Sequence, residues 1–360
     1  MRSPEEHVQL DALTTMGVGG PASHYWRAIN SEEVQRADSW ARQHSVPLIV
    51  LAGGSNVIIS DEGIAGLVLH LCSTGVAATR DGDDQLITAA AGERWDELVA
   101  WTVERGLAGL ECLSGIPGTV GGTPIQNVGA YGQEVSSTLH ALTAYDRSTK
   151  AIVSLTRADC SFGYRTSRFK AADAGRFVVC DVTFRLRAGD ATLAYPDLLR
   201  YLAERDVQRP TLAQVREAVL SVRRSKGMVL DPRDVDTRSV GSFFTNPVLE
   251  LDAVDRIGRE TARSVPAFAT DSSRMKVPAA WLLEQIGCGR GYGEGPVGLS
   301  SKHPLAIVNR GGATAKHVVA FAATLKRRVA ERFGVTLFPE PAFLGFRDDD
   351  DVTYLRAGAA

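Results

Sequence analysis

The stretch Ser114-Gly-Ile-Pro-Gly-Thr-Val-Gly-Gly-Thr-Pro-Ile-Gln-Asn-Val-Gly-Ala-Tyr-Gly132 combines many glycines and two prolines with several apolar residues. Glycine lets a backbone approach a ligand closely, whereas proline restricts the backbone and stiffens the loop. The side chains of Gln126 and Asn127 offer paired donors and acceptors that suit the edge of a ring. We therefore interpret the stretch as an ordered functional loop and not as a linker.

A second glycine-rich segment, Ala52-Gly53-Gly54-Ser55-Asn56, directly follows a predicted buried strand at 47–51. Two consecutive glycines let successive backbone N–H groups point at one spot, as they do in anion-binding nests. A phosphate group is the expected ligand. The same residues also form ordinary hairpin turns, so on its own this segment leaves both interpretations open.

Length and composition limit the class of protein. A chain of 360 residues is expected to form two or three domains. A net charge of −2 provides no large field for nucleic acid or an anionic membrane. The five cysteines are scattered without a C-x-x-C pair, which is typical of reduced cytosolic thiols, and no apolar run approaches the roughly 18 residues of a membrane span. We expect a cytoplasmic protein with no metal, no nucleic-acid partner and no membrane insertion.

Hydrophobic periodicity predicts alternating helices and strands. Asn30-Ser31 is a typical helix start, and Trp95, Leu98 and Val99 begin an amphipathic helix that Gly106 ends. Further helices are predicted at 211–224, 277–286 and 314–333, and strands at 139–145, 151–155, 177–186 and 335–338. The acidic residues 348–351 indicate a solvated tail with too little apolar surface to order itself.

Several familiar motifs are absent or incomplete. Gly17-Val-Gly19-Gly-Pro-Ala22 matches a dinucleotide-binding fingerprint by letter, but no strand leads into it, and Pro21 stands where the helix should run. The sequence contains no P-loop and no G-x-S-x-G motif. Its seven histidines show no metal-ligand spacing.

Three polar residues downstream suit chemistry, although each also has a plainer explanation. Arg165 lies among aromatic residues, where its planar fork could bind a carboxylate or phosphate, or simply pack on the rings. Ser242 follows a glycine in a stiff apolar setting, where its hydroxyl could bond only locally. Glu340 stands between two prolines that fix its backbone, and spacing alone favours an exposed turn residue.

Taken in order, these segments resemble the UDP-N-acetylenolpyruvoylglucosamine reductases, the MurB-type flavoenzymes of cell-wall synthesis. The resemblance runs from about residue 13 to residue 346 and rests on the order of its motifs. These motifs are Thr14-Thr-Met-Gly-Val-Gly-Gly-Pro-Ala22, Ala52-Gly-Gly-Ser-Asn56, Ser114 to Gly132, Phe162-Gly-Tyr-Arg165, Gly241-Ser-Phe-Phe244, Lys276-Val-Pro-Ala-Ala-Trp281 and Pro339-Glu340.

The resemblance implies an α+β fold with a two-part FAD-binding unit of the vanillyl-alcohol-oxidase (PCMH) type, followed by an α+β substrate-binding domain. It implies FAD-binding subdomains at 1–71 and 72–213, a substrate-binding domain at 214–347 and a flexible acidic tail at 348–360. Non-covalent FAD is then expected on Ala52, Gly53, Gly54, Ser55, Asn56, Val57, Ser114, Gly115, Ile116, Pro117, Gly118, Gly121, Gly122, Gln126, Asn127, Gly129, Ala130 and Tyr131.

The resemblance also implies the chemistry. In the family, NADPH reduces the flavin, which then passes hydride to C3 of UDP-N-acetylglucosamine enolpyruvate to give UDP-N-acetylmuramate for peptidoglycan. Arg165 and Glu340 are expected to stabilise the negative charge that this addition creates, and Ser242 to deliver the proton to C2.

Four further residues are expected to bind substrate. Tyr195 resembles the tyrosine of the type I branch that closes over the nucleotide, and Lys226, Asn246 and Gln285 align with substrate-contacting positions. The interval from Lys226 to Ser242 is longer than usual, which weakens the alignment of Lys226. We expect a monomer. Two alternatives stay open, namely another FAD-dependent sugar or alcohol oxidoreductase of this fold, and a nucleotide-sugar or flavin-binding protein without turnover.

Overall fold

The structure is a computed structural model that describes residues 3–191, 193 and 195–358. The chain forms two compact units, each of which is described by itself. The first unit comprises Met1–Val8, Ala22–Gly54 and Ile64–Val229, and the second comprises Gln9–Pro21, Ser55–Gly63 and Leu230–Ala360. The chain therefore passes from one unit to the other between Gly54 and Ser55, inside the second glycine-rich segment.

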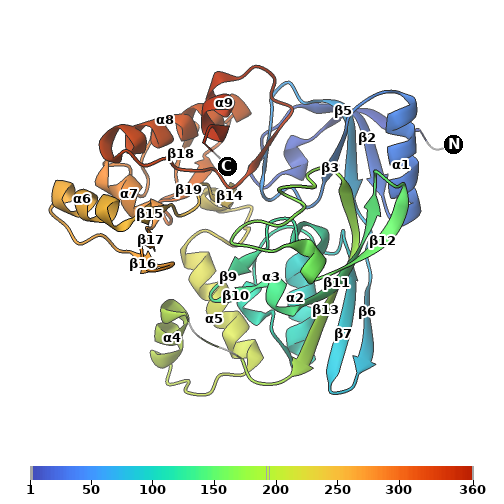
Figure 1. Ribbon diagram of the computed structural model, residues 1–360, viewed down its shortest axis with the longest axis horizontal. Coiled ribbons are helices and arrows are strands. Elements are labelled where there is room, and N and C mark those ends of the chain that lie inside the picture. The colour runs from blue at the N-terminus through green and yellow to red at the C-terminus, as the bar shows by residue number, and fades with distance from the viewer. Residues whose placement is uncertain (1–2, 192, 194, 359–360) are drawn as a thin grey trace. The chain divides into compact units, whose positions relative to one another are not determined.

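The first unit begins with a four-stranded sheet and one covering helix (Figure 1). The strand order is β1 (Glu5–Gln9), β2 (Pro21–Ala28), β5 (Ile64–Leu71) and β3 (Leu48–Leu51), and both β2 and β3 run parallel to β5. Helix α1 (Ser31–Gln43) starts where the sequence predicts, because the Asn30 side chain accepts the N–H of Glu33. Val34, Ala37 and Ala41 of α1 are buried against this sheet.

An antiparallel sheet forms the larger part of the first unit. Its order is β12 (Ala151–Thr156), β11 (Leu139–Asp146), β13 (Phe177–Ala188), β7 (Asp84–Ala90) and β6 (Val76–Asp81), with β8 (Leu107–Ala108) paired to β13. The predicted strands at 139–145, 151–155 and 177–186 are thus confirmed. Helix α2 (Trp95–Glu104) buries Trp95, Leu98 and Val99 in the core of this sheet, as the periodicity predicts.

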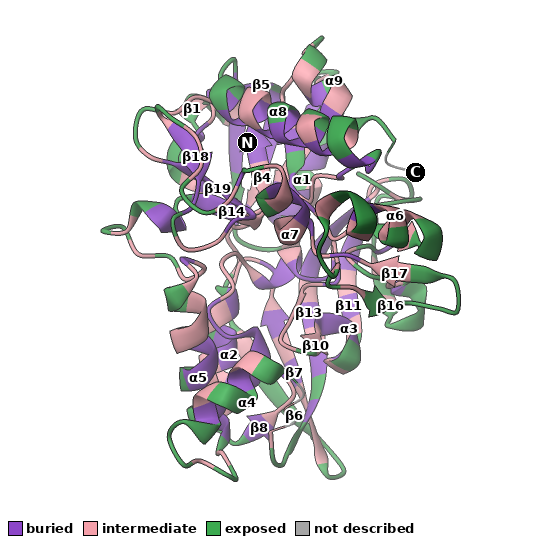
Figure 2. Cartoon of the chain, turned by 90° about the vertical axis from the view of Figure 1, so that its left-hand side faces the viewer, coloured by how far each residue is buried: buried purple, intermediate pink, exposed green. Residues whose placement is uncertain are grey.

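Two helices complete the first unit. Helix α5 (Leu212–Ser225) has a capping box between Thr211 and Gln214, and it packs with α4 (Pro196–Ala203) over a small core that includes Cys112. Figure 2 shows buried and exposed stripes along α5, as expected of an amphipathic helix. The expected boundary at residue 214 falls inside α5, and the first unit extends to Val229.

The second unit contains three small sheets and four helices among its described residues. The strand orders are β14 (Ser239–Ser242), β19 (Ala306–Asn309), β18 (Val297–Leu299); β15 (Val248–Glu250), β17 (Arg274–Lys276), β16 (Phe268–Ala269); and the parallel pair β20 (Ala342–Leu344), β4 (Val57–Ile59). The helices are α6 (Leu251–Thr261), α7 (Ala279–Gln285), α8 (Ala315–Phe333) and α9 (Asp350–Arg356). The helices predicted at 277–286 and 314–333 are confirmed as α7 and α8.

Two predictions for the C-terminal region are wrong. The predicted flexible tail contains α9, whose Val352 and Leu355 are buried against α8, the red helix beside it in Figure 1. The residues of the predicted strand at 335–338 belong to no sheet in the described part of the chain, and the neighbouring Pro339 forms an isolated bridge to Phe244. Apolar Val335 and Leu337 are buried, as the strand prediction requires, but the segment makes no hydrogen-bonded ladder with another described strand.

Candidate functional site

The two glycine-rich segments meet within the first unit. A Cβ atom added to Gly53 would lie 2.5 Å from the Cα of Gly118, so only glycine permits the observed approach. Ala52 likewise lies near Gly122, whose added Cβ would be 3.5 Å from the Cβ of Ala52. The structure therefore brings together Ala52, Gly53 and Gly118, which the sequence analysis assigned to one cofactor site.

Two residues of the loop from 114 to 132, Gly121 and Thr119, have different relations to the protein interior. Gly121 packs against Ala91, where an added Cβ would come within 2.5 Å of the Ala91 Cβ, so this glycine is needed by the fold itself. Thr119, one residue after Gly118, has a buried hydroxyl for which the described residues provide no hydrogen-bond partner. Buried polar groups without a partner are uncommon in folded proteins. This hydroxyl beside a glycine cradle fits a polar ligand such as FAD.

The side chain of Asn127 makes hydrogen bonds within the protein, in addition to the contact with a ring edge that the sequence predicts. Its side chain donates to Glu134 Oε2 at 2.8 Å and to the Gly163 carbonyl at 3.2 Å, and it accepts the N–H of Ser136 at 3.0 Å. The side chain is 1% exposed and Asn127 has a φ of +47°. The amide is thus used to hold the loop, and its expected contact with the edge of a ligand ring stays a prediction.

Ser114 and Gly115 also make protein contacts at the start of the loop. The Ser114 hydroxyl is buried and donates to the Glu111 carbonyl at 2.7 Å, while the N–H of Gly115 donates to Asp96 Oδ1 at 2.6 Å. Both terminal nitrogens of Arg216 donate to the carboxylate of Asp96, at 2.6 and 2.9 Å. These contacts anchor the loop to α2 and α5.

Arg165 lies against the same loop. Its Nη2 donates to the carbonyl of Gly129 at 2.8 Å, and its guanidinium lies 5.6 Å from the centre of the Tyr164 ring. Arg165 has a φ of +54°, which is uncommon for a residue with a side chain and is often found at functional sites. The structure thus joins the predicted arginine to Gly129 of the predicted cofactor loop.

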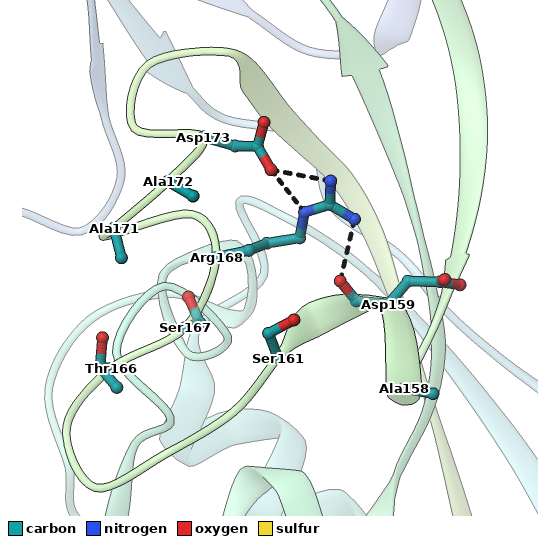
Figure 3. A pocket seen from close by; sticks show the side chains of 9 residues that line it. All are labelled: Ala158, Asp159, Ser161, Thr166, Ser167, Arg168, Ala171, Ala172 and Asp173. Atoms are coloured by element: carbon teal, nitrogen blue, oxygen red, sulfur yellow. Dashed lines mark hydrogen bonds and ion pairs between the residues drawn. The ribbon is translucent and has the colours of Figure 1, made fainter.

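A hollow of about 550 Å³ lies beside the segment that carries Arg165 (Figure 3). It is lined by small side chains and by Arg168, whose guanidinium is paired with Asp173 at 2.7 Å and donates to the Asp159 carbonyl. The hollow contains none of the expected site residues. Because Asp173 neutralises its one lining cation, it offers no charge for an anionic nucleotide, and we assign it no ligand.

A cluster of polar residues joins the end of the loop to α4 and α5. The Tyr131 and Tyr195 rings meet edge to face, with centres 5.1 Å apart. Lys226 Nζ lies 2.8 Å from Asp197 Oδ2, and both side chains are about one-third exposed. Burial opposes the charge of Lys226, but its hydrogen bond to Asp197 and the neighbouring groups raise its pKa above the ordinary value. The predicted residues Tyr131, Tyr195 and Lys226 therefore lie in one cluster.

Two members of this cluster were missed by the sequence analysis. Asp197 follows Tyr195 by two residues, so its position beside the expected nucleotide-contacting tyrosine was a usable signal. Arg223 precedes Lys226 by three residues on α5; its Nη2 donates to the Met228 carbonyl at 2.7 Å, while its buried Nε has no partner among the described residues. Burial lowers the pKa of Arg223.

Ser242 and Glu340 lie on adjacent segments of the second unit. Ser242 ends β14, after Gly241 with a φ of +78°, and the N–H of Glu340 donates to the Phe243 carbonyl at 2.8 Å. Asn56 donates from Nδ2 to the Glu340 carbonyl at 3.3 Å and accepts the N–H of Ala342 at its own carbonyl. Asn56, expected on FAD pyrophosphate, is thus also part of the frame that holds Glu340.

Asn246 and Gln285 lie at opposite ends of α7. Asn246 Oδ1 accepts the N–H of Ala279 at 3.0 Å, which satisfies one of the free donors at the start of the helix, while Gln285 is its last residue. Of the expected site residues, Arg165, Tyr195 and Lys226 belong to the first unit, and Ser242 and Glu340 to the second.

Comparison with known proteins accounts for this combination of features. Residues 22–153 match a family described as an FAD binding domain, and residues 231–344 match the C-terminal domain of UDP-N-acetylenolpyruvoylglucosamine reductase. A UDP-N-acetylenolpyruvoylglucosamine reductase of Thermobifida fusca is 46% identical over 94% of this chain and 97% of its own length. The chain belongs to the UDP-N-acetylenolpyruvoylglucosamine reductase family.

Other family members agree with this assignment. The reductase of Streptomyces coelicolor is 47% identical over 93% of this chain and 89% of its own length. The crystal structure of the MurB reductase from Thermus caldophilus matches with a TM-score of 0.65 at 27% identity, and the match covers 96% of this chain and 99% of that one. The α+β fold of the reductase family, with an FAD-binding domain followed by the family's C-terminal domain, is thereby confirmed.

The described residues contain neither a helix suited to a membrane nor a cluster suited to a metal ion. No described helix has both the length and the apolar character needed to span a bilayer. Within the same part of the chain, no group of three or more His, Cys, Asp or Glu side chains is arranged to hold a metal ion.

Proposed function

We propose that this protein uses NADPH and FAD to reduce UDP-N-acetylglucosamine enolpyruvate to UDP-N-acetylmuramate, a step of peptidoglycan biosynthesis. The observation that carries the proposal is the 46% identity to a UDP-N-acetylenolpyruvoylglucosamine reductase over 94% of this chain. Both parts of such a reductase are matched, since the FAD-binding and C-terminal families cover separate regions.

The residues expected to hold FAD are those of the two glycine-rich segments. Gly53 and Gly118 allow these segments to meet, Gly54 has a φ of +61°, and Thr119 adds a buried hydroxyl to the set. Backbone N–H groups after β3 suit the pyrophosphate. FAD held there, once reduced by NADPH, would supply the hydride for C3 of the enolpyruvyl group.

Arg165, Glu340 and Ser242 are proposed to act on the substrate. Hydride addition to a conjugated enol ether leaves negative charge at C2 and on the adjoining carboxylate. Arg165 supplies a fixed positive charge for it, and Glu340, when protonated, donates a hydrogen bond to the enol oxygen. Ser242 delivers a proton to C2, because a serine hydroxyl can serve as an acid only toward a strongly basic, enolate-like carbon.

Tyr195, Lys226, Asn246 and Gln285 are proposed to bind the nucleotide part of the substrate. Support comes from the contact of Tyr195 with Tyr131 and from the raised pKa of Lys226, which keeps that lysine cationic for a diphosphate. We further propose that the enzyme is a cytoplasmic monomer. The antiparallel sheet begins at Val76, after Cys72, which supports FAD-binding subdomains at 1–71 and from 72 onward.

The proposal is tested by following the flavin spectrum in two steps. Purified protein should contain releasable FAD, NADPH should bleach its absorption, and UDP-N-acetylglucosamine enolpyruvate should restore it in the absence of oxygen. Reduction of the flavin by a simple sugar or alcohol, followed by reoxidation with oxygen but not with the enolpyruvyl nucleotide, would instead indicate an oxidase of the same fold.

A further inference from the structure

We propose that the C-terminal helix α9 is a positioning element for Glu340, which it holds from both sides through Lys326 and Arg356. This inference rests on the proposed function, because it concerns the carboxylate assigned there to the reaction. The residues that carry it all lie in the second unit.

Lys326 is the centre of the arrangement. It lies on α8 and is 2% exposed, and its ammonium donates to the carbonyls of Tyr354, Leu355 and Ala357 at 2.8, 2.9 and 3.0 Å. The three N–H donors of a lysine are thereby matched to three carbonyls at the C-terminal end of α9, where the helix dipole favours a cation. A buried charge is tolerated only when it is satisfied in this way, so Lys326 fixes α9 on α8.

The same ammonium lies beside the segment that leads into Glu340. Its Nζ is 5.5 Å from the centre of the Phe338 ring. Gly358, which follows α9, lies close to the same ring, since a Cβ atom added to this glycine would be 3.5 Å from Cε1 of Phe338. The Phe338 carbonyl is held on its other side by the N–H of Thr245 at 2.9 Å. Phe338 is therefore enclosed by α8, the end of α9 and the chain that follows Ser242.

Arg356 holds the opposite flank of Glu340. Its Nη2 donates to the carbonyl of Phe343 at 2.8 Å, and its guanidinium lies 5.9 Å from the centre of the Phe343 ring. Phe343 belongs to β20, which pairs with β4 through Ile58. Arg356 of α9 thus contacts Phe343, three residues after Glu340, while Phe338, two residues before Glu340, lies beside Lys326 of α8, the residue that holds the end of α9.

This arrangement has a chemical consequence. Glu340 is fixed at its backbone N–H by Phe243 and at its carbonyl by Asn56, and both contacts depend on where the 338–343 segment lies. A displacement of about 1 Å at a reacting group can cost a factor of roughly 100 in rate. Loosening α9 should therefore slow protonation-linked reduction of the substrate and spare reduction of the flavin by NADPH, which needs no acid.

The experiment compares three variants of the full-length enzyme with bound FAD. Lys326→Met removes the ammonium but keeps an apolar stem, and Arg356→Met removes the contact with Phe343 from an exposed residue. Lys316→Met is the matched control, because it makes the same exchange of lysine for methionine at an exposed position of α8. Each half-reaction is measured by stopped flow, and hydrogen–deuterium exchange is followed for residues 338–344.

We expect both test variants to reoxidise with saturating enolpyruvyl substrate about 10- to 100-fold more slowly, with flavin reduction by NADPH within twofold of the wild type. Exchange at 338–344 should be faster in both variants and unchanged in Lys316→Met. If Lys326→Met does not fold, Arg356→Met alone decides. Unchanged exchange at 338–344, equal loss in both half-reactions, or no loss in either overturns the inference.

Failure of the proposed function gives a different result. In that case the wild-type enzyme itself would not be reoxidised by the enolpyruvyl substrate, whatever the variants do. The exchange measurement does not depend on turnover, so normal exchange at 338–344 in Arg356→Met would still overturn the role of α9.

Discussion

Replacing Gly53 by alanine should weaken FAD binding sharply, because the added methyl group has no room. Its Cβ would lie 2.5 Å from the Cα of Gly118, 2.8 Å from the carbonyl carbon of Gly118 and 2.9 Å from the N of Thr119. Carbon atoms in contact normally stay about 3.5–4.0 Å apart, so the two segments must separate by roughly 1 Å. All three atoms belong to the backbone, and no side chain can rotate away.

The size of the effect follows from the cost of overpacking. Inserting a methyl group into a packed site typically costs about 1–3 kcal/mol. If that strain is relieved by opening the cradle, the dissociation constant of FAD rises about 5- to 150-fold. The position has an ordinary backbone conformation, so the loss is steric and does not come from a positive φ.

The assay is titration of the apoprotein with FAD, followed by the quenching of flavin fluorescence. Gly189→Ala is the matched control, since the same unit contains this glycine and nothing lies within 4 Å of its added Cβ. An FAD dissociation constant within twofold of the wild type in Gly53→Ala would refute the conclusion that close contact between the two segments forms the cofactor cradle.

Three other outcomes are expected. Ser242→Ala should leave flavin reduction by NADPH intact and slow reoxidation by the substrate by several orders of magnitude in stopped flow, whereas equal loss in both steps would indicate a damaged flavin site. Asp197→Asn should tighten binding of UDP-N-acetylglucosamine enolpyruvate to the oxidised enzyme about two- to fivefold at low salt, because loss of an ion pair that is about one-third exposed and worth about 0.5–1 kcal/mol frees Lys226 for the diphosphate; weaker binding in a flavin fluorescence titration would contradict this. The pKa of Asp146 is held below its ordinary value by its hydrogen bonds from Arg176, so its stabilising effect is present above the unfolded-state pKa of about 3.9 and is lost as the pH falls below it. Urea denaturation should therefore show Asp146→Asn to be less stable than the wild type at pH 7, with a smaller difference at pH 3, and a difference that grows on acidification would exclude this explanation.

Elements with local signals could be predicted from the sequence. Helix α8 starts with a capping box between Thr314 and His317 and ends at Gly334 with a φ of +66°, and both signals lie within the helix and its immediate neighbours. Helix α9 could not be predicted in the same way. Its stretch is acidic and short, and it is ordered by Lys326, which lies on a different helix.

The candidate site shows the same division. Glycine density located the two segments that meet at Gly53 and Gly118, because close backbone approach requires glycine whatever the fold. The fate of the Asn127 amide depends on Glu134 and Gly163, and which donors meet which acceptors is decided only by tertiary packing. The residue type therefore indicated that hydrogen bonds would form, but not with which partner.

The pairing of β4 with β20 can form only late in the synthesis of the chain. Val57 is placed opposite Ala342, 285 residues later in the chain. At about 5–20 residues per second, a ribosome needs roughly 15–60 s to make that interval, and contacts between such distant residues form slowly. During this time the apolar residues Val57, Ile58 and Ile59 lack the strand with which they pair in the folded protein, until residues 342–344 have been synthesised.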